Sequence, residues 1–249
     1  MLFSAALCSG AVAQFTHLDI HAGIGYGKMV DNLISKGGVL SCEVGAYTNL
    51  GIKNAHSVVA DNLYFQMGVN LKLRGGAFSE EHTVGGYLSQ REGSYKAWYA
   101  QIPFLVNYRF ELPVRQPNHY VRAFLGPAFS VGLFGTYNDR KVSPYQPQRS
   151  MNYEIKNDPV FNYMNRLDVN MLFGVGYEYD LLALSLYVDY GFLSIHNETD
   201  MIRFMETAYS SMELPSGTDT KNLIPGGNLL SFYLTLSYRL PFNKYEGSK

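Results

Sequence analysis

The chain has 249 residues and a formal net charge of −1 at pH 7, so it lacks the basic excess that nucleic-acid binding usually requires. Charged residues make up only 16% of the chain, while 20 Tyr and 24 Gly favour tightly packed β structure over a helical bundle. No run of about 18 or more apolar residues is present, which excludes an ordinary transmembrane helix.

The first predicted element is a secretory signal peptide over residues 1–13. Its apolar core ends near Cys8, and a small-x-small motif that ends at Ala13 precedes the expected cleavage. No basic n-region precedes the core, as expected of a truncated or misassigned start. The alternative to a signal peptide is that residues 1–13 form an apolar first strand or anchor. After cleavage only Cys42 would remain, so we expect no disulfide framework. The mature domain is predicted over 14–249.

Eight segments then follow in which apolar and polar residues alternate with period 2. Their apolar faces run over residues 18–26, 40–46, 63–73, 98–110, 121–133, 167–179, 182–190 and 230–240. These faces carry no charged residue and no side-chain amide, whereas the opposite faces carry charges, amides and glycines. The pattern predicts eight long β-strands, each with two chemically distinct faces.

Two architectures fit eight such strands: a soluble lipocalin-like barrel with the apolar face inside, and a membrane barrel with that face toward lipid. The segments run to about 10–14 residues, longer than the usual globular strand of about 5–6 and long enough to cross a bilayer. The polar faces mix both charges with Gly and Ser, as a narrow filled lumen would. Aromatic residues gather at the ends of the apolar faces, as in an interfacial girdle: Tyr26, Trp98, Tyr108, Tyr177, Tyr179, Tyr190 and Tyr238.

We therefore predict an all-β fold, an eight-stranded antiparallel transmembrane β-barrel of the outer-membrane type with up-and-down meander topology. Such barrels alternate short periplasmic turns with long outer loops. We expect short turns at 113–119 and about 180–181, and long loops at about 75–95, 136–164 and 196–227. Both chain ends then lie on the periplasmic side. The connection at 51–61 is longer than this scheme expects.

Pro103 lies inside the fourth segment, although proline has no N–H to give to a β-ladder. If the following turn centres near 115–116, Pro103 lies opposite Ala128, and Pro127 lies opposite Phe104. Both prolines then lie at one height near the bilayer midplane. Pro103 is expected to face the lumen, where polar groups can serve the carbonyl that loses its donor. We predict a bulge or a local gap in the ladder between the fourth and fifth strands.

Five stretches of sequence occur in a characteristic order: "AQIPFLVNYRF", "YVRAFLGPAF", "FGVGYEY", "LYVDYGFLSI" and "LSFYLTLSYRL". In this order and spacing, over most of residues 15–240, the chain resembles the Bacteroidota outer-membrane β-barrel family that includes PorT-like proteins. The resemblance implies an eight-stranded barrel and, for PorT itself, a part in type IX secretion. No motif in the chain places it in that subgroup.

Several charges on the polar faces fall near the periplasmic ends of their strands: Asp19, Arg109, Glu111, Arg122, Glu178 and Arg239. One interpretation is a path for protons or ions. The interpretation we favour is a plug of salt bridges, because unpaired charges in a narrow lumen are costly. Eight strands leave an interior that side chains can fill, so a general porin is not expected.

Two histidine patterns are candidates for chemistry. His17 and His21 lie on one strand face about 13 Å apart by strand rise, too far to share one metal ion; ligation with other strands is the alternative. His196, Glu198 and Asp200 gather acid and imidazole groups on one outer loop, but a hydrolase also needs an oriented base and an activated nucleophile in mutual reach. We predict no catalytic residue, no metal site, no cofactor and no enzymatic activity.

The outer loops carry the stronger functional signal. Residues 136–164 and 200–214 hold aromatic and Met side chains among charges and prolines, and exposed loops of this kind tend to bind a partner; the alternative is that they fold over the barrel mouth and seal it. We expect a structural or interaction subunit of an envelope assembly in the bacterial outer membrane. Its expected partners are the lipid bilayer, lipopolysaccharide and another envelope protein. A small channel, a type IX secretion component, and a lipid-modifying enzyme or protease are the alternatives.

Overall fold

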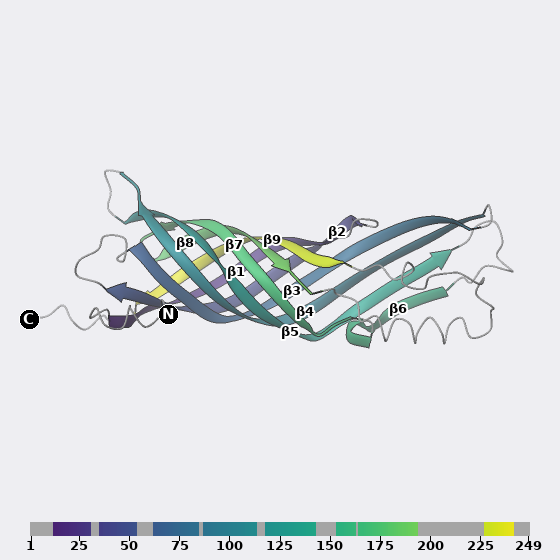
Figure 1. Cartoon of the computed structure of the whole chain (residues 1–249), viewed down its shortest axis with the longest axis horizontal. Coiled ribbons are helices and arrows are strands. Elements are labelled where there is room, and N and C mark those ends of the chain that lie inside the picture. The colour runs from purple at the N-terminus through teal and green to yellow at the C-terminus, as the bar shows by residue number, and fades with distance from the viewer. Residues whose placement is uncertain are drawn as a thin grey trace, which may run out of the picture.

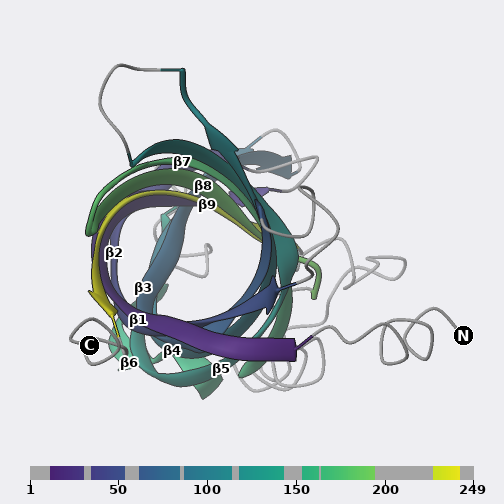
Figure 2. The same cartoon turned by 90° about the vertical axis from the view of Figure 1, so that its left-hand side faces the viewer.

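The alternating segments form a closed antiparallel β-barrel that is elongated along its axis in the computed structural model of the chain (Figure 1). Viewed along this axis, the strands form a ring (Figure 2). The structure describes residues 12–30, 35–53, 62–84, 87–113, 118–142, 153–162, 164–193 and 227–241. In these segments no helix has the length and hydropathy of a membrane span. The predicted signal peptide lies almost entirely outside them and stays a prediction.

Nine strands are present in the described segments. They are β1 (Val12–Val30), β2 (Ser35–Lys53), β3 (Leu63–Val84), β4 (Tyr87–Glu111), β5 (His119–Val142), β6 (Tyr153–Pro159), β7 (Leu167–Tyr179), β8 (Leu182–Gly191) and β9 (Asn228–Pro241). Eight of them neighbour one another in the order β4-β3-β2-β1-β9-β8-β7-β5, and pairing of β4 with β5 closes the ring. The predicted eight-stranded barrel is confirmed, and β6 is an additional strand that pairs with the far part of β5.

The two faces of each strand divide as predicted. In β1, Ile24 faces outward and is 64% exposed, while His21 faces inward and is 3% exposed. The pairing registers extend this division around the ring, since Ile24 lies opposite Cys42 of β2 and Leu234 of β9. An apolar belt on the outer wall with a polar interior is the pattern of a barrel that sits in lipid. The predicted girdle residues are exposed or half-exposed at its edges: Tyr26, Trp98, Tyr108, Tyr177, Tyr179, Tyr190 and Tyr238.

Two of the three predicted outer loops are wrong, because strands occupy most of them. In place of a loop at 75–95, β3 and β4 continue as a paired hairpin as far as Val84 and Tyr87. In place of a loop at 136–164, β5 runs on to Val142 and pairs with β6. Where side chains are described in these parts, outward positions such as Ser94, Lys96 and Thr136 are not apolar. The period-2 signal that lipid contact imposes on the sequence therefore disappears there. The third predicted loop, 196–227, lies almost entirely outside the described residues.

The short turns are confirmed. A two-residue turn joins β7 to β8 at Asp180 and Leu181, and Asp180 adopts a positive φ of 51°. β4 and β5 are joined across residues 112–118, where the amide of Leu112 donates to the carbonyl of His119 at 2.9 Å. Short turns mark the periplasmic end in this architecture, so the long β3–β4 hairpin marks the extracellular end. Most of the predicted 51–61 connection lies outside the described residues.

The ladder between β4 and β5 has the local gap that the prolines predict. Pro103 is buried on the lumen side and lies opposite Ala128. The next two pairs, starting with Phe104 and Pro127, are missing from the ladder, and pairing then resumes in the same register. The gap lies in the apolar belt. Because pairing resumes beyond it, the prolines are accommodated by interrupting the ladder rather than by ending the strand.

Candidate functional site

The lumen is the candidate site that the sequence singled out, and side chains fill it. A cavity of about 10 Å³ lies at mid-height, which is room for about one water molecule. Two layers of paired charges lie across the lumen. We call them the outer network, toward the extracellular end, and the inner network, toward the β7–β8 turn.

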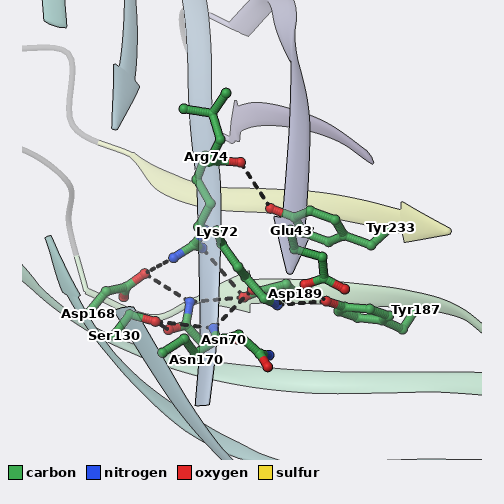
Figure 3. Close-up of polar contacts among 12 residues, drawn as sticks. Glu43, Asn70, Lys72, Arg74, Ser130, Asp168, Asn170, Tyr187, Asp189 and Tyr233 are labelled. Carbon is green, nitrogen blue, oxygen red and sulfur yellow. Dashed lines mark hydrogen bonds and ion pairs between the residues drawn. The ribbon is translucent and has the colours of Figure 1, made fainter. Parts of the chain in front are cut away.

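The outer network consists of Glu43, Lys72, Arg74, Asp168 and Asp189 (Figure 3). Lys72 Nζ lies 3.1 Å from Glu43 Oε2 and 3.2 Å from Asp189 Oδ2. Arg74 Nη1 donates to Asp168 Oδ2 at 2.9 Å, and its Nη2 lies 3.5 Å from Asp189 Oδ1. All of these side chains except Asp168 are fully buried. A buried charge that loses its partner costs about 3–5 kcal/mol. Because any rearrangement would break these pairs, they hold the lumen in one arrangement.

Amide and hydroxyl groups complete the outer network. Asn170 Nδ2 donates to Asp168 Oδ2 at 2.9 Å and to Asp189 Oδ1 at 3.0 Å. Gln101 Nε2 donates to Asp189 Oδ2 at 3.1 Å. Ser130 Oγ donates to Asn170 Oδ1 at 2.6 Å (Figure 3). The carboxylate of Asp189, on β8, therefore has partners on β3, β4 and β7. This one side chain links both halves of the ring across the lumen.

Two tyrosines pack against the lysine of the outer network. The rings of Tyr187 and Tyr233 are stacked with centroids 5.3 Å apart. Lys72 Nζ donates to the Tyr187 hydroxyl at 2.7 Å and lies 4.7 Å from the centroid of the Tyr233 ring. The Tyr187 hydroxyl in turn donates to Glu43. A cation over an aromatic face in a desolvated site contributes about 2 kcal/mol. The same apolar cluster fills the lumen with Leu105, Phe124, Ala128 and Leu172.

The inner network consists of Asp19, Arg122, Glu178 and Arg239. The predicted plug of salt bridges is therefore confirmed for four of the six predicted residues. Arg239 Nε donates to Asp19 Oδ1 at 3.2 Å, and its Nη2 lies 3.3 Å from Glu178 Oε2. Arg122 Nη1 lies 3.5 Å from Glu178 Oε1. The Tyr64 hydroxyl donates to that same oxygen at 3.1 Å. Pairs from β1, β5, β7 and β9 therefore close the lumen near its periplasmic end.

The predicted salt-bridge plug is wrong for Arg109 and Glu111, which lie where β4 leaves the lumen. The guanidinium of Arg109 lies 4.7 Å from the centroid of the Tyr120 ring and 5.8 Å from that of Tyr64, as a half-buried cation on aromatic faces. Glu111 is exposed at the end of β4. Strand parity gives the correct face for both residues, but it does not show where the barrel wall ends.

The two histidines of β1 are part of the lumen packing. The His21 ring stacks on Tyr47 with centroids 4.3 Å apart, and its Nε2 lies 4.0 Å from Glu43 Oε1. His17 Nε2 lies 3.6 Å from Asp19 Oδ1. Within the part of the chain that the structure describes, no group of three His, Cys, Asp or Glu side chains is arranged to hold a metal ion.

An apolar seal closes the extracellular mouth of the lumen. The 3-10 helix η1 (Val160–Asn162) brings Val160 into the mouth, and Met164 follows it; both are buried. The Phe161 ring packs edge-on against Tyr99 with centroids 6.0 Å apart. We call Val160, Phe161 and Met164 the mouth seal. It packs against a buried cluster supplied by β1, β3, β4, β5 and β9: Met29, Phe78, Tyr95, Ala97, Tyr99, Tyr137 and Leu229.

Alternation in the sequence places every member of the outer network except Arg74 on a predicted polar face, but it does not bring them together. Arg74 follows Lys72 by two residues, so period 2 puts it on the lumen face. That signal is present but obscured, because the apolar face of β3 ends beside it at Leu73 and a loop is expected from residue 75. The acid and imidazole cluster of His196, Glu198 and Asp200 lies outside the described residues.

A family model described as an outer membrane protein beta-barrel domain matches residues 17–198, most of the chain. The chain belongs to this family of outer-membrane β-barrel proteins. The match agrees with the ring of eight strands, the lipid-facing belt and the polar lumen, and it places the protein in the bacterial outer membrane. It does not single out the PorT-like group or the Bacteroidota.

Similar solved structures include the following three bacterial proteins. Neisserial surface protein A is 12% identical, with a TM-score of 0.35 and coverage of 90% of this chain and 97% of that protein. The attachment invasion locus protein Ail of Yersinia pestis is 8% identical, with a TM-score of 0.31 and coverage of 91% and 100%. A major outer membrane protein from Thermus thermophilus is 14% identical, with a TM-score of 0.42 and coverage of 90% and 99%. No curated protein matches the chain.

Proposed function

We propose that this protein is a non-enzymatic, sealed anchor in the outer membrane that presents an extracellular β-sheet to another component of the cell envelope. The observation that carries the proposal is the continuation of β3, β4 and β5 well beyond the rest of the ring (Figure 1). The lumen below them is closed at both ends by the inner network and the mouth seal. A barrel that served only to cross the membrane would not need these extensions. The extracellular parts of β3 to β6 form one continuous sheet.

The filled lumen favours an anchor over a small channel. A hydrated ion would have to part the pairs of Lys72 with Glu43 and Asp189, which are fully buried. Separating a buried ion pair costs about 3–5 kcal/mol because it leaves charges without partners. The mouth seal then adds an apolar barrier in series with both networks.

The arrangement of the buried charges also favours an anchor over an enzyme. Carboxylates and cations in the lumen are held in fixed pairs around a cavity of about 10 Å³, too small for a substrate. The enzyme alternative therefore depends on His196 and Glu198. We expect their substitution by Ala to leave lipid A structure and envelope proteolysis unchanged.

The resemblance to PorT-like barrels makes a component of type IX secretion the first partner to test. After extraction in mild detergent, the wild-type protein is expected to co-purify with one envelope protein in fixed stoichiometry. A variant in which a short turn replaces residues 80–91 of the β3–β4 hairpin should lose that partner. It should keep the heat-modifiable gel migration of a folded barrel. Wild-type protein that purifies alone, or a trimmed variant that keeps the partner, would contradict the proposal.

A further inference from the structure

Charge is distributed unevenly between the two ends of the barrel. At the periplasmic end the exposed charged side chains are acidic, namely Glu111 and Asp180. At the extracellular end four are basic and one is acidic: Lys96, Arg140, Lys156, Arg166 and Glu92. These counts concern the residues whose side chains the structure describes. The extracellular rim of the wall therefore suits an anionic surface.

Lys96 stands directly above the apolar belt on β4. Trp98, two residues nearer the membrane, pairs with Phe134 of β5 with ring centroids 6.4 Å apart at the edge of the belt. Two residues along a strand span about 6.6 Å, or roughly 5 Å of height in a tilted barrel strand. The head-group layer of one leaflet is about 5–7 Å thick. Lys96 therefore lies at the level of lipid head groups.

A groove opens on the same outward wall, immediately beyond Lys96. Its volume is about 310 Å³, and it lies between β4, β5 and β6. Its described lining includes Ser94, Asn138, Arg140 and Lys156. Ser94 lies opposite Asn138, one outward-facing step above Lys96, and Arg140 lies one step further. The groove thus combines a hydroxyl, an amide and cations, the groups that bind sugars and phosphates.

Two cations of this wall are available to a ligand. Among the described residues, neither Lys96 nor Arg140 forms an ion pair, and both side chains are exposed. The groove also contains two carboxylates, which occupy different places. Asp139 is buried and accepts a hydrogen bond from the Tyr137 hydroxyl at 3.1 Å. Glu92 lies two residues beyond Ser94 and directly opposite Arg140 in the β4–β5 register, but within the described structure the two side chains form no ion pair.

We infer that this groove and Lys96 bind the phosphorylated sugar head group of an outer-leaflet glycolipid, whose acyl chains lie on the Trp98–Phe134 pair below. Three features favour a glycolipid. The groove is continuous with the lipid-facing wall, and its volume suits a sugar unit. Lys96, at its membrane-side edge, lies at head-group height, while Arg140 lies two outward-facing steps farther from the membrane. This inference goes beyond the proposed interaction with a protein partner, since it concerns the outer wall and the lipid.

The test uses the full-length protein in nanodiscs of phosphatidylcholine that contain diphosphorylated lipid A, dephosphorylated lipid A or phosphatidylglycerol. Native mass spectrometry of the released protein measures bound lipid. For the K96A/R140A variant we expect lipid A binding to fall about 30-fold, the equivalent of about 2 kcal/mol at about 1.4 kcal/mol per tenfold change. K28A is the matched control, because Lys28 lies on β1 at the opposite wall. It should bind lipid A as the wild type does.

Three results would overturn the inference. They are wild-type lipid A binding by K96A/R140A, an equal loss in K28A, or an equal affinity of the wild type for phosphatidylglycerol. The last result would mean that the wall recognises negative charge and not a phosphorylated sugar. Heat-modifiable migration verifies folding of each variant. The K96R/R140K variant keeps both positive charges, so it should bind lipid A as the wild type does. If K96A/R140A fails to fold, this second variant still tests the inference, because loss of lipid A binding by folded K96R/R140K would contradict it. Pull-down of the protein partner is a separate readout, so failure here and failure of the proposed function can be told apart.

Discussion

The membrane-embedded part of β4 and its extracellular part are built in opposite ways. Within the apolar belt, Gln101 and Asn107 face the lumen, while Ile102 faces lipid and is 46% exposed. Farther out on the same strand, Tyr95 is buried on the inner side and Lys96 is exposed on the outer side. The backbone geometry is the same in both parts. The surrounding medium therefore decides which face of a strand is apolar.

A β-bulge marks the change between the two parts. The β4–β5 register shifts between Trp98 and Tyr99, and as a result Leu133 and Phe134 of β5 both face outward. A bulge inserts one extra residue into a strand and re-aims the side chains that follow. Here it adds an apolar residue to the rim of the belt. Beyond it, Tyr137 faces the apolar cluster of the mouth.

The largest expected effect comes from breaking the polar core of the membrane part. Replacing Lys72 by Met leaves Glu43 and Asp189 without their shared cation in a fully buried site. We expect the free energy of unfolding to fall by about 3–5 kcal/mol, as measured by urea titration in lipid vesicles. Lys96→Met is the matched control on the same sheet, and an exposed change of this kind should cost less than about 0.5 kcal/mol. Equal losses for both variants would show that the two parts do not differ.

A smaller effect is expected from placing a charge on the outer wall. Val175 of β7 lies in the belt and is 54% exposed, so Val175→Arg should destabilise the barrel by about 2–4 kcal/mol near the bilayer midplane. Thr136→Arg puts the same side chain on the outward face of the extracellular part of β5, where we expect a change below about 0.5 kcal/mol. Heat-modifiable gel migration against temperature measures both. A harmless Val175→Arg would mean that the belt does not face lipid.

The smallest effect should follow from loosening the mouth seal. Met164→Ala removes a buried apolar side chain and should cost about 2 kcal/mol, confined to the extracellular part. Hydrogen exchange should then speed up in η1 and in the far end of β5, while amides of β8 keep their protection. Asn162→Ala, at an exposed position of η1, is the control. Faster exchange throughout the barrel would instead show that both parts open as one unit.

The sequence predicts the membrane part well because lipid imposes an apolar residue at every second position. It predicts the extracellular part poorly, since a strand such as β6 has no such requirement and its residues resemble a loop. The outer network shows a second limit. Alternation gives the face of Lys72 and of Asp189 but not their height in the barrel, so a pair that is separated by 117 residues is invisible without the registers. The proline gap was predictable because a turn centred near 115–116 sets the β4–β5 register and brings Pro103 and Pro127 to one height.

Conductance across a planar bilayer tests the central claim most directly, because a sealed anchor and a small channel differ there without ambiguity. After reconstitution of the wild-type protein, with a general porin in the same lipid as the positive control, we expect no single-channel steps. The outer network, the inner network and the mouth seal each block the path. Regular, reproducible current steps from folded wild-type protein would contradict the account of a closed lumen.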